Sequence, residues 1–181
     1  GRKNMNTIIG NTPMIKINYQ YLGKKRAIYT KLEYYNLTGS IKDRVAEHIL
    51  NKAYESGKLL ERLPIIEATS GNTGISFAAL GASRKNPVII FMPDWVSTER
   101  VNLMKSYGAI IELVSREEGG FLECIRRADE LAEKLGGYRP NQFSNPDNIK
   151  VHYLTTGNEI LKQMNQQVDG FVSGIGTGGT L

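Results

Sequence analysis

The sequence predicts an α/β fold with three layers, in which helices cover both faces of parallel sheets. Short runs rich in β-branched and aromatic residues alternate with longer segments whose apolar residues recur at helical spacing. This alternation is typical of β–α–β units, whose right-handed crossovers place successive strands parallel. Residues 88–91 and 110–111 are continuously apolar, as expected of strands that are covered on both faces.

Strands are placed by short β-rich runs that end at proline, glycine or polar residues. They are expected at residues 14–17, 27–33, 64–68, 87–92, 109–114 and 168–173. The last of these leads into a glycine-rich segment that normally opens a helix. The chain ends at Leu181, where that helix would begin. We therefore expect the chain to be an incomplete part of a larger protein.

Helices are placed by apolar periodicity and by end signals. They are expected at residues 42–56, 72–84, 97–107, 120–135 and 155–166. In the first of these, Val45, Ile49 and Ala53 fall on one face. Ser97 is the expected N-cap of the third helix. Cys124 lies beside the apolar face of the fourth helix, which predicts a packing role for it.

Composition excludes several classes of function. A chain of 181 residues can form one ordinary domain or two small ones, and 40% hydrophobic with 23% charged residues is typical of a globular protein. The net charge of +5 is spread along the chain, which argues against nucleic-acid binding. No apolar run approaches the ~18 residues of a membrane span. No signal peptide is visible in residues 1–10, so the cytoplasm is the expected compartment.

The metal-ligating residue types are too few and too scattered to predict a metal site. The single cysteine, Cys124, excludes an internal disulfide and a CxxC motif. His48 and His152 lie far apart in the sequence and form neither an HxH nor an HExxH pattern. Both histidines are therefore interpreted as structural, and no metal site is expected.

A glycine-rich segment at residues 174–180 is suited to holding a phosphate. Glycines allow positive φ and close approach of backbone N–H groups to an anion, and Thr177 and Thr180 add hydroxyl donors. The segment lacks the Gly-Lys-Ser/Thr of a P-loop. Gly174, Gly176 and Gly179 satisfy the GxGxxG pattern of dinucleotide sites, but that pattern alone is weak. A purely structural turn is an equal alternative for this segment taken by itself.

A second segment, residues 69–74, links an expected strand to an expected helix. Its hydroxyl groups, the Asn72 amide and the first N–H groups of the helix point to one place. Such a cluster suits a carboxylate that is held by neutral donors. The alternative is simple helix capping by Ser70 or Asn72.

Lys42 follows a turn at residues 36–40 and begins an expected helix. A helix N-terminus disfavours an ammonium group and so lowers the pKa of a lysine. A lysine that forms a Schiff base needs a lowered pKa, because only the neutral amine attacks a carbonyl group. The alternative is a surface lysine paired with Asp43 or Glu47. The two glycine-rich segments favour the Schiff base, since together they offer sites for a phosphate and a carboxylate.

With these segments in place, the sequence resembles the fold-type II pyridoxal-phosphate enzymes, in particular the cysteine synthase and cystathionine β-synthase family. The likeness runs along essentially all of the chain. It is carried by Ile9-Gly10-Asn11-Thr12-Pro13, by residues 36–44 and 69–74, by Gln142-Phe143-Ser144-Asn145-Pro146, and by residues 176–180. The run Gly71-Asn72-Thr73 favours the cysteine synthase branch, because related dehydratases and racemases often carry histidine in place of the threonine.

The resemblance implies a site built around pyridoxal 5′-phosphate. Lys42 would form the Schiff base and act as general base, and Asn72 would bind the pyridoxal 3′-oxygen. The phosphate would be held by Gly176, Thr177, Gly178, Gly179 and Thr180. The substrate carboxylate would be bound by Thr69, Ser70, Thr73 and Gln142.

The resemblance also implies an activity and an assembly. The reaction would be β-replacement on an O-activated serine or cysteine, through an aminoacrylate intermediate, with O-acetylserine and sulfide giving cysteine and acetate. Formation of cystathionine or lanthionine, and release of hydrogen sulfide from cysteine, are the related alternatives. The substrate would be a small amino acid, and the family implies a homodimer.

The same likeness divides the chain and shows what it lacks. Residues 1–45 and 144–181 would belong to a large cofactor-binding domain, and residues 46–143 to a smaller mobile one. The C-terminal part of the large domain, with the serine that contacts the pyridine nitrogen, has no counterpart here. Leu37 stands where the family usually has proline. Trp95 is either a specificity element or a packing residue.

Two other classes of function stay open. The first is an inactive or regulatory homologue, which the incomplete length favours and the presence of Lys42 opposes. The second is a nucleotide-binding oxidoreductase based on the GxGxxG pattern, which leaves Lys42 and residues 69–74 unexplained.

Overall fold

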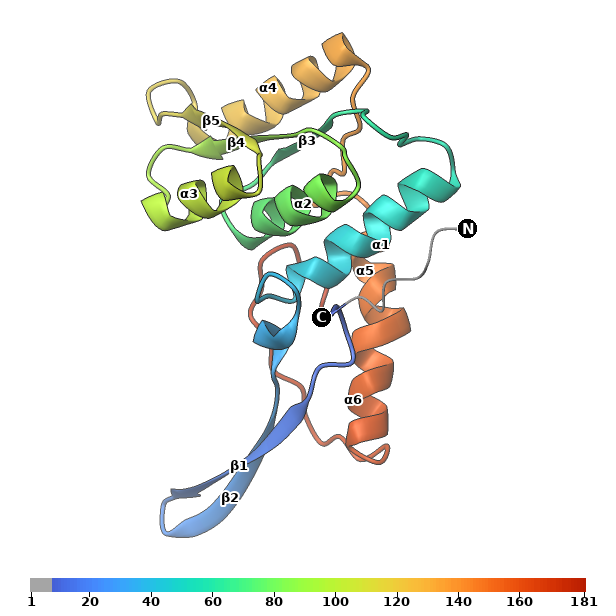
Figure 1. The fold of residues 1–181 in the computed structure, drawn as a ribbon. Helices are drawn as coiled ribbons and strands as arrows, with labels where there is room; N and C mark the ends of the chain where they lie inside the picture. Colours follow the sequence, from blue (N-terminus) through green and yellow to red (C-terminus); the bar gives the residue numbers. More distant parts are fainter. Residues whose placement is uncertain (1–7) are drawn as a thin grey trace.

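The computed structural model describes residues 8–181, and a three-stranded parallel sheet lies at the centre of its upper half (Figure 1). The strands are β3 (Ile65–Ala68), β4 (Val88–Pro93) and β5 (Ile110–Val114), in that spatial order. Pairs such as Ile66 with Ile89 and Ile89 with Ile110 set the register. The parallel sheet that the strand–helix alternation predicts is confirmed here.

Helices cover both faces of this sheet, as predicted. Helices α1 (Lys42–Glu55), α2 (Asn72–Ser83) and α3 (Thr98–Ser106) lie on one face, and α4 (Gly120–Leu135) lies on the other (Figure 1). We call residues 42–138 the sheet unit.

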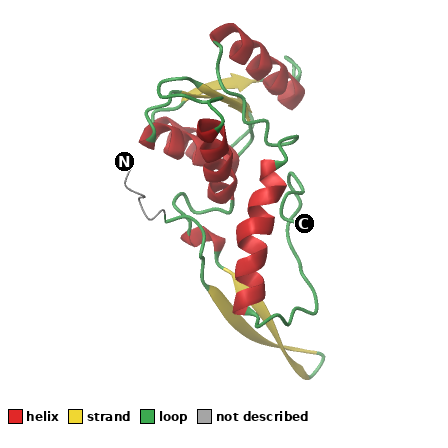
Figure 2. Ribbon diagram, turned by 90° about the vertical axis from the view of Figure 1, so that its right-hand side faces the viewer, coloured by secondary structure: helices red, strands yellow, loops and turns green. Residues whose placement is uncertain are grey.

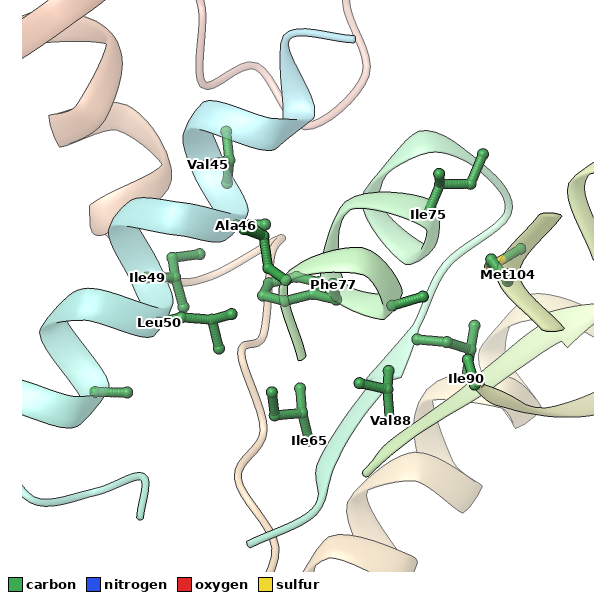
Figure 3. Close-up of a cluster of buried hydrophobic side chains, with 14 of the residues drawn as sticks. Val45, Ala46, Ile49, Leu50, Ile65, Ile75, Phe77, Val88, Ile90 and Met104 are labelled. Carbon is green, nitrogen blue, oxygen red and sulfur yellow. The ribbon is translucent and has the colours of Figure 1, made fainter. Parts of the chain in front are cut away.

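Two apolar clusters fill the spaces between these layers. Figure 3 shows the larger cluster, in which Phe77 of α2 meets side chains of α1 and of the strands. The smaller cluster joins α4 to the other face, and Cys124 lies fully buried in it. The packing role predicted for Cys124 is confirmed, and burial raises the pKa of its thiol to about 11.

The first two strands form a separate antiparallel hairpin, which differs from the all-parallel expectation. They are β1 (Met14–Tyr21) and β2 (Lys24–Lys31), and Met14 pairs with Lys31. Only Leu22 and Gly23 connect them, both at positive φ. So short a connection turns the chain back on itself, whereas parallel strands need a crossover of a dozen or more residues. The hairpin is longer than the two runs predicted from sequence.

A nearly continuous helical rod follows the sheet unit (Figure 2). It consists of α5 (Asp147–Val151), the π-helical turn η2 (His152–Thr156) and α6 (Gly157–Gln163), so it begins earlier than the helix predicted at 155–166. A short 3-10 helix, η1 (Glu33–Tyr35), links the hairpin to the turn before α1. We call β1 and β2 together with α5, η2 and α6 the arm.

The strand predicted at residues 168–173 is wrong. These residues form an irregular segment that runs back beside the helical rod (Figure 2). A strand exists only where another backbone offers hydrogen bonds, and no described strand pairs with this segment.

Ser97 is the N-cap residue of α3, as predicted, although its side chain makes no capping hydrogen bond. Its backbone carbonyl accepts hydrogen bonds from the N–H groups of Arg100 and Val101 instead.

Within residues 8–181, no helix is both long and apolar enough to span a membrane. The same range contains no group of three or more His, Cys, Asp or Glu side chains that could hold a metal ion. Residues 1–7, which make up most of the segment inspected for a signal peptide, lie outside the described part.

Candidate functional site

Lys42 lies at the first position of α1, as predicted, and its side chain is partly buried. Its backbone N–H donates to the Ser40 hydroxyl at 3.2 Å, so the turn before the helix supports its start. Its Nζ lies 3.3 Å from Oγ1 of Thr177, a residue 135 positions away in sequence. Burial lowers the pKa of Lys42, which favours the neutral amine. The cause is loss of solvent around the amine.

The alternative in which Lys42 pairs with Asp43 is not what the structure shows. The Asp43 side chain is fully buried and accepts hydrogen bonds from the Thr38 backbone N–H at 2.6 Å and from the Ser76 hydroxyl at 2.6 Å. Asp43 therefore ties the turn before Lys42 to helix α2. This contact fixes the base of the lysine relative to the loop that begins α2.

The glycine-rich loop at residues 176–180 contacts the Lys42 side chain through Thr177. Thr177 Oγ1 accepts a hydrogen bond from Asn148 Nδ2 at 2.8 Å in addition to the one from Lys42. A Cβ atom on Gly179 would collide with the side-chain amide of Asn148, so only glycine fits there. Gly178 has a φ of +79°, which also favours glycine. The loop therefore has small residues where its backbone must approach another group.

His152 packs beneath the same loop. Its Nδ1 lies 2.9 Å from Oγ1 of Thr156, and its Nε2 lies 3.5 Å from Oγ1 of Thr180. Burial, with added repulsion from Lys42 and Arg44, lowers the pKa of His152 to about 4. At neutral pH the imidazole is uncharged, so one of its nitrogens donates a hydrogen bond and the other accepts one.

Residues 69–74 form the other side of the site, between β3 and α2. Thr69 and Thr73 are buried, whereas Ser70 and Asn72 are exposed. The N-cap of α2 is Gly71, and no side chain caps it. The capping alternative for Ser70 and Asn72 is therefore not what the structure shows.

Gln142 reaches this loop from a distant part of the chain, as the sequence grouping predicts. Its Oε1 accepts a hydrogen bond from the Thr73 hydroxyl at 2.6 Å, and its Nε2 donates to the Ala68 carbonyl at 3.2 Å. The Gln142 side chain is 4% exposed. We call Thr73 and Gln142 the clamp.

Asn148 connects the two sides, and sequence reasoning missed it. Its Nδ2 donates both to the backbone carbonyl of Gln142 at 2.9 Å and to Thr177 Oγ1 at 2.8 Å. Asn148 is buried, and no hydrogen-bond partner of its Oδ1 lies within the described residues. Asn148 and His152 lie four residues apart, which places both on one helix face beneath the glycine loop. That spacing was the only signal in the sequence.

Trp95 packs away from these contacts. The Arg116 guanidinium lies 4.8 Å from the centre of its ring, and a Cβ on Gly120 would come within 3.1 Å of it. About half of the Trp95 surface is exposed. These contacts favour packing between the loops that precede α3 and α4.

The model of one protein family, described as pyridoxal-phosphate dependent enzymes, matches residues 5–181. The chain belongs to this family. Among curated relatives, a cysteine synthase of Staphylococcus aureus is 43% identical over 179 residues, which is 98% of this chain and 57% of the relative. A probable cysteine synthase of Bacillus subtilis is 40% identical, over 96% of this chain and 57% of the relative.

Solved structures of family members have the same fold. A hydrogen sulfide-producing enzyme of Fusobacterium nucleatum is 52% identical with a TM-score of 0.92, over 96% of this chain and 53% of that one. A cysteine synthase of Entamoeba histolytica is 37% identical with a TM-score of 0.88, over 99% of this chain and 56% of that one. The chain thus spans somewhat more than half the length of these relatives.

The geometry around Lys42 fits the cofactor of this family. A partly buried amine of lowered pKa suits an aldehyde, and it lies at a loop of glycines and threonines that suits a phosphate. Because Gly179 has no Cβ, the backbone of the loop can lie directly against the Asn148 amide. These features agree with pyridoxal 5′-phosphate and leave the nucleotide-binding alternative without support.

Proposed function

We propose that the protein catalyses pyridoxal-phosphate dependent β-replacement on an O-activated serine or on cysteine, with cysteine synthesis as its main reaction. O-acetylserine and hydrogen sulfide would give cysteine and acetic acid, so a C–O bond at Cβ breaks and a C–S bond forms there. The contact that carries the proposal joins Lys42 Nζ to Thr177 Oγ1 in the glycine loop, because it puts an amine of lowered pKa beside a phosphate-type cradle.

Each residue has a part in this proposal. The bound cofactor would supply an electron sink for the carbanion at the substrate Cα. Lys42 would attach the cofactor aldehyde and, once released, take the proton from Cα. The backbone N–H groups and hydroxyls of residues 176–180 would hold the phosphate, and Asn72 would hydrogen-bond the ring oxygen next to the aldehyde.

The substrate carboxylate would be bound at the loop that opens α2. Thr69, Ser70, Thr73 and Gln142 supply hydroxyl, amide and backbone donors there, and Arg100 lies at the same loop, where its Nη1 donates to the Ser70 carbonyl at 3.4 Å. The proposed contacts to the carboxylate are hydrogen bonds from these neutral donors. The Asn148 bridge supports this role, because it keeps the clamp at a fixed distance from the glycine loop.

Release of hydrogen sulfide from cysteine is the second candidate. It is favoured by the 52% identity to the solved hydrogen sulfide-producing enzyme of Fusobacterium nucleatum. Formation of cystathionine or lanthionine would use the same residues with another nucleophile. We propose a cytoplasmic homodimer that acts on a small amino acid.

Borohydride trapping tests the proposal. The protein, in the longest natural form that contains this sequence, is loaded with pyridoxal phosphate, reduced with borohydride and digested, and the modified peptide is mapped. We expect a yellow protein with the pyridoxyl group on Lys42. Lys42→Ala should lose the label, and its turnover should fall on the order of 10³-fold. Lys52→Ala is the matched control, because Lys52 lies on the same helix with an exposed amine paired to Glu55.

The outcomes separate the classes of function. A protein that stays colourless with added cofactor contradicts the proposal and supports an inactive homologue. Label on other lysines, with Lys42 unmodified, also contradicts it. Once Lys42 is labelled, product analysis decides between the two candidates: cysteine from O-acetylserine and sulfide, or sulfide from cysteine alone.

A further inference from the structure

Glu67 is a fully buried carboxylate for which the proposed reaction has no use. It lies in β3, two residues before Thr69, and 1% of it is exposed. Its Oε1 accepts hydrogen bonds from Arg139 Nη1 and from the backbone N–H of Ala68, the latter at 2.8 Å. Its Oε2 accepts from the backbone N–H of Gln142 at 3.3 Å. Burial raises its pKa, although Arg139 and these N–H groups oppose the rise.

The partners of Glu67 lie where the backbone hydrogen bonds between β3 and a neighbouring segment are interrupted. Residues 138–142 run beside β3 on the edge not taken by β4. The Tyr138 backbone forms two hydrogen bonds of the parallel type: its carbonyl accepts from the Ile66 N–H of β3 at 2.9 Å, and its N–H donates at 2.8 Å to the carbonyl of Pro64, just before β3. The next donor of such a ladder would be residue 140, which is a proline without an N–H.

Side chains make the missing bonds. Arg139 Nη1 donates to the Ile66 carbonyl at 3.1 Å, and Glu67 accepts the Ala68 and Gln142 N–H groups. The other side of Arg139 is held by Asp129 of α4, at 2.7 Å from its Nε. The segment is thus held to β3 by one ion pair where its backbone has no donor.

The same arrangement fixes which way the Gln142 amide faces. Because Nε2 donates to the Ala68 carbonyl, Oε1 is the atom that accepts the Thr73 hydroxyl hydrogen. Turning the amide over would place two oxygens, that of Gln142 and that of Ala68, against each other. One N–H of Nε2 is left for another acceptor, since a primary amide has two donors.

We propose that Glu67, through its ion pair with Arg139, is a positioning residue that holds Gln142 so that the second N–H of its amide meets the carboxylate of the amino-acid substrate. This inference rests on the proposed function, because it assigns the carboxylate to the clamp. Glu67 touches neither the substrate nor the cofactor. It acts on the backbone that carries Gln142.

Glu67→Gln is the sharpest variant, because it keeps the shape and removes one acceptor. A glutamine has a single acceptor oxygen, so its NH₂ group must face either Arg139 and Ala68 or the N–H of Gln142. In either orientation two donors oppose each other, and the segment loosens. At saturating cofactor, we expect KM for the amino-acid substrate to rise roughly tenfold, with a much smaller change in kcat.

Non-additivity with Gln142 distinguishes positioning from general damage. Gln142→Ala alone should also raise KM, and adding Glu67→Gln to it should raise KM no further, because both remove the same contact. Leu59→Ala is the stability control: it opens a cavity in the core away from the clamp and should lower Tm while KM stays unchanged. If the rise in KM of the double variant equals the product of the rises in the two single variants, the inference is overturned.

Hydrogen exchange of the cofactor-free protein gives a readout that needs no activity. Amides of residues 138–146 should exchange faster in Glu67→Gln than in wild type, while α2 stays unchanged. If Glu67→Gln does not fold, Arg139→Lys replaces it, since lysine keeps the charge but not the three contacts of Arg139. An unchanged exchange rate and an unchanged KM overturn the positioning role. A wild-type protein without turnover instead contradicts the proposed function, and exchange alone then decides the role of Glu67.

Discussion

The sheet unit has a buried apolar core, whereas in the arm many large apolar side chains face outward. Phe77 and Ile90 are fully buried in the main cluster, but Ile28 of the hairpin is 51% exposed and Tyr153 of the helical rod is 78% exposed. Val151 of α5 packs in the main apolar cluster, but the hairpin and α6 are attached to α1 by charged groups that have little contact with water. The two regions therefore owe their positions to different forces, although residues of both form the candidate site.

Arg44 is the centre of the charged attachment. Arg44 is 2% exposed, and its guanidinium forms double contacts with Glu33, at 2.8 and 2.9 Å, and with Glu159, at 2.7 and 2.8 Å. Lys31 of β2 also binds Glu159, at 2.7 Å. We call Arg44, Glu33, Glu159 and Lys31 the ion cluster. It joins the hairpin and α6 to the helix that begins at Lys42.

The difference shows what each region is sensitive to. Apolar burial is non-directional and hardly depends on pH, so the sheet unit should respond mainly to changes of volume. A buried ion cluster stabilises only while every charge has its partner, and the loss of one partner leaves an uncompensated charge. The position of Lys42 relative to the arm should therefore depend on charge.

The largest expected effect comes from Arg44→Met. It leaves Glu33 and Glu159, whose side chains are only 18% and 15% exposed, without their main partner, which should cost about 3–5 kcal/mol of unfolding free energy. Chemical denaturation measures this value. Arg126→Met is the matched control, because Arg126 also pairs with two glutamates but 56% of its side chain is exposed, and it should cost under ~1 kcal/mol. Equal losses in the two variants would contradict the comparison.

Acid should loosen the arm before the sheet unit. Burial alone would raise the pKa of Glu159, but hydrogen bonds from Arg44 and Lys31 outweigh it and bring the pKa to about 2. Because the folded pKa lies below the usual value near 4.5, this contribution is complete above pH 4.5 and is lost as the pH falls towards 2. The shift corresponds to at most about 3 kcal/mol.

Hydrogen exchange at a series of pH values measures this effect region by region. Amides of α6 and of the hairpin base should lose protection between pH 4.5 and pH 2, while those of β4 keep theirs. Glu159→Gln should flatten the pH dependence. A simultaneous loss in both regions would show that the ion cluster does not set the acid response of the arm.

The smallest expected effect comes from removing a single methylene group from one side chain in each region. Ile90→Val in the buried cluster should cost about 1 kcal/mol, independent of pH, because it opens a small cavity without touching a charge. Ile28→Val on the exposed face of the hairpin should leave stability nearly unchanged. Thermal unfolding of both variants at two pH values tests this pair, and a larger loss for the hairpin variant would reverse the comparison.

The sequence predicted the sheet unit well because its signals are local. The helix Gly120–Leu135 has the predicted bounds, and β3, β4 and β5 lie within a residue of theirs. Apolar periodicity directly reflects which face is buried, so each element could be read alone. The strand expected at residues 168–173 depended on a partner backbone, which no local pattern contains. The early start of α5 and the antiparallel hairpin were missed for a related reason, since both depend on neighbouring segments.

The candidate site was predictable in its residue types but not in its connections. Lys42 with Thr177, and Thr73 with Gln142, are contacts between segments that had been grouped from sequence, and the functional roles of these residues remain predictions. Asn148 looked like an ordinary polar residue, and Glu67 stands 72 positions before Arg139. Hydrogen bonds between side chains so far apart follow from tertiary packing, not from spacing.

The ion cluster also has a consequence for the order of folding. Its contacts span long stretches of chain: Arg44 and Glu159 are 115 residues apart, and the backbone N–H of Asn11, which also donates to Glu159, is 148 residues away from it. Strand–helix units of the sheet unit close much shorter loops, and closing a long loop costs more chain entropy. During synthesis the sheet unit can therefore form while α6 is still being made. We expect the cluster to close after the sheet unit has formed, and the contact of Lys42 with Thr177 to follow, because Thr177 comes after Glu159 in the chain.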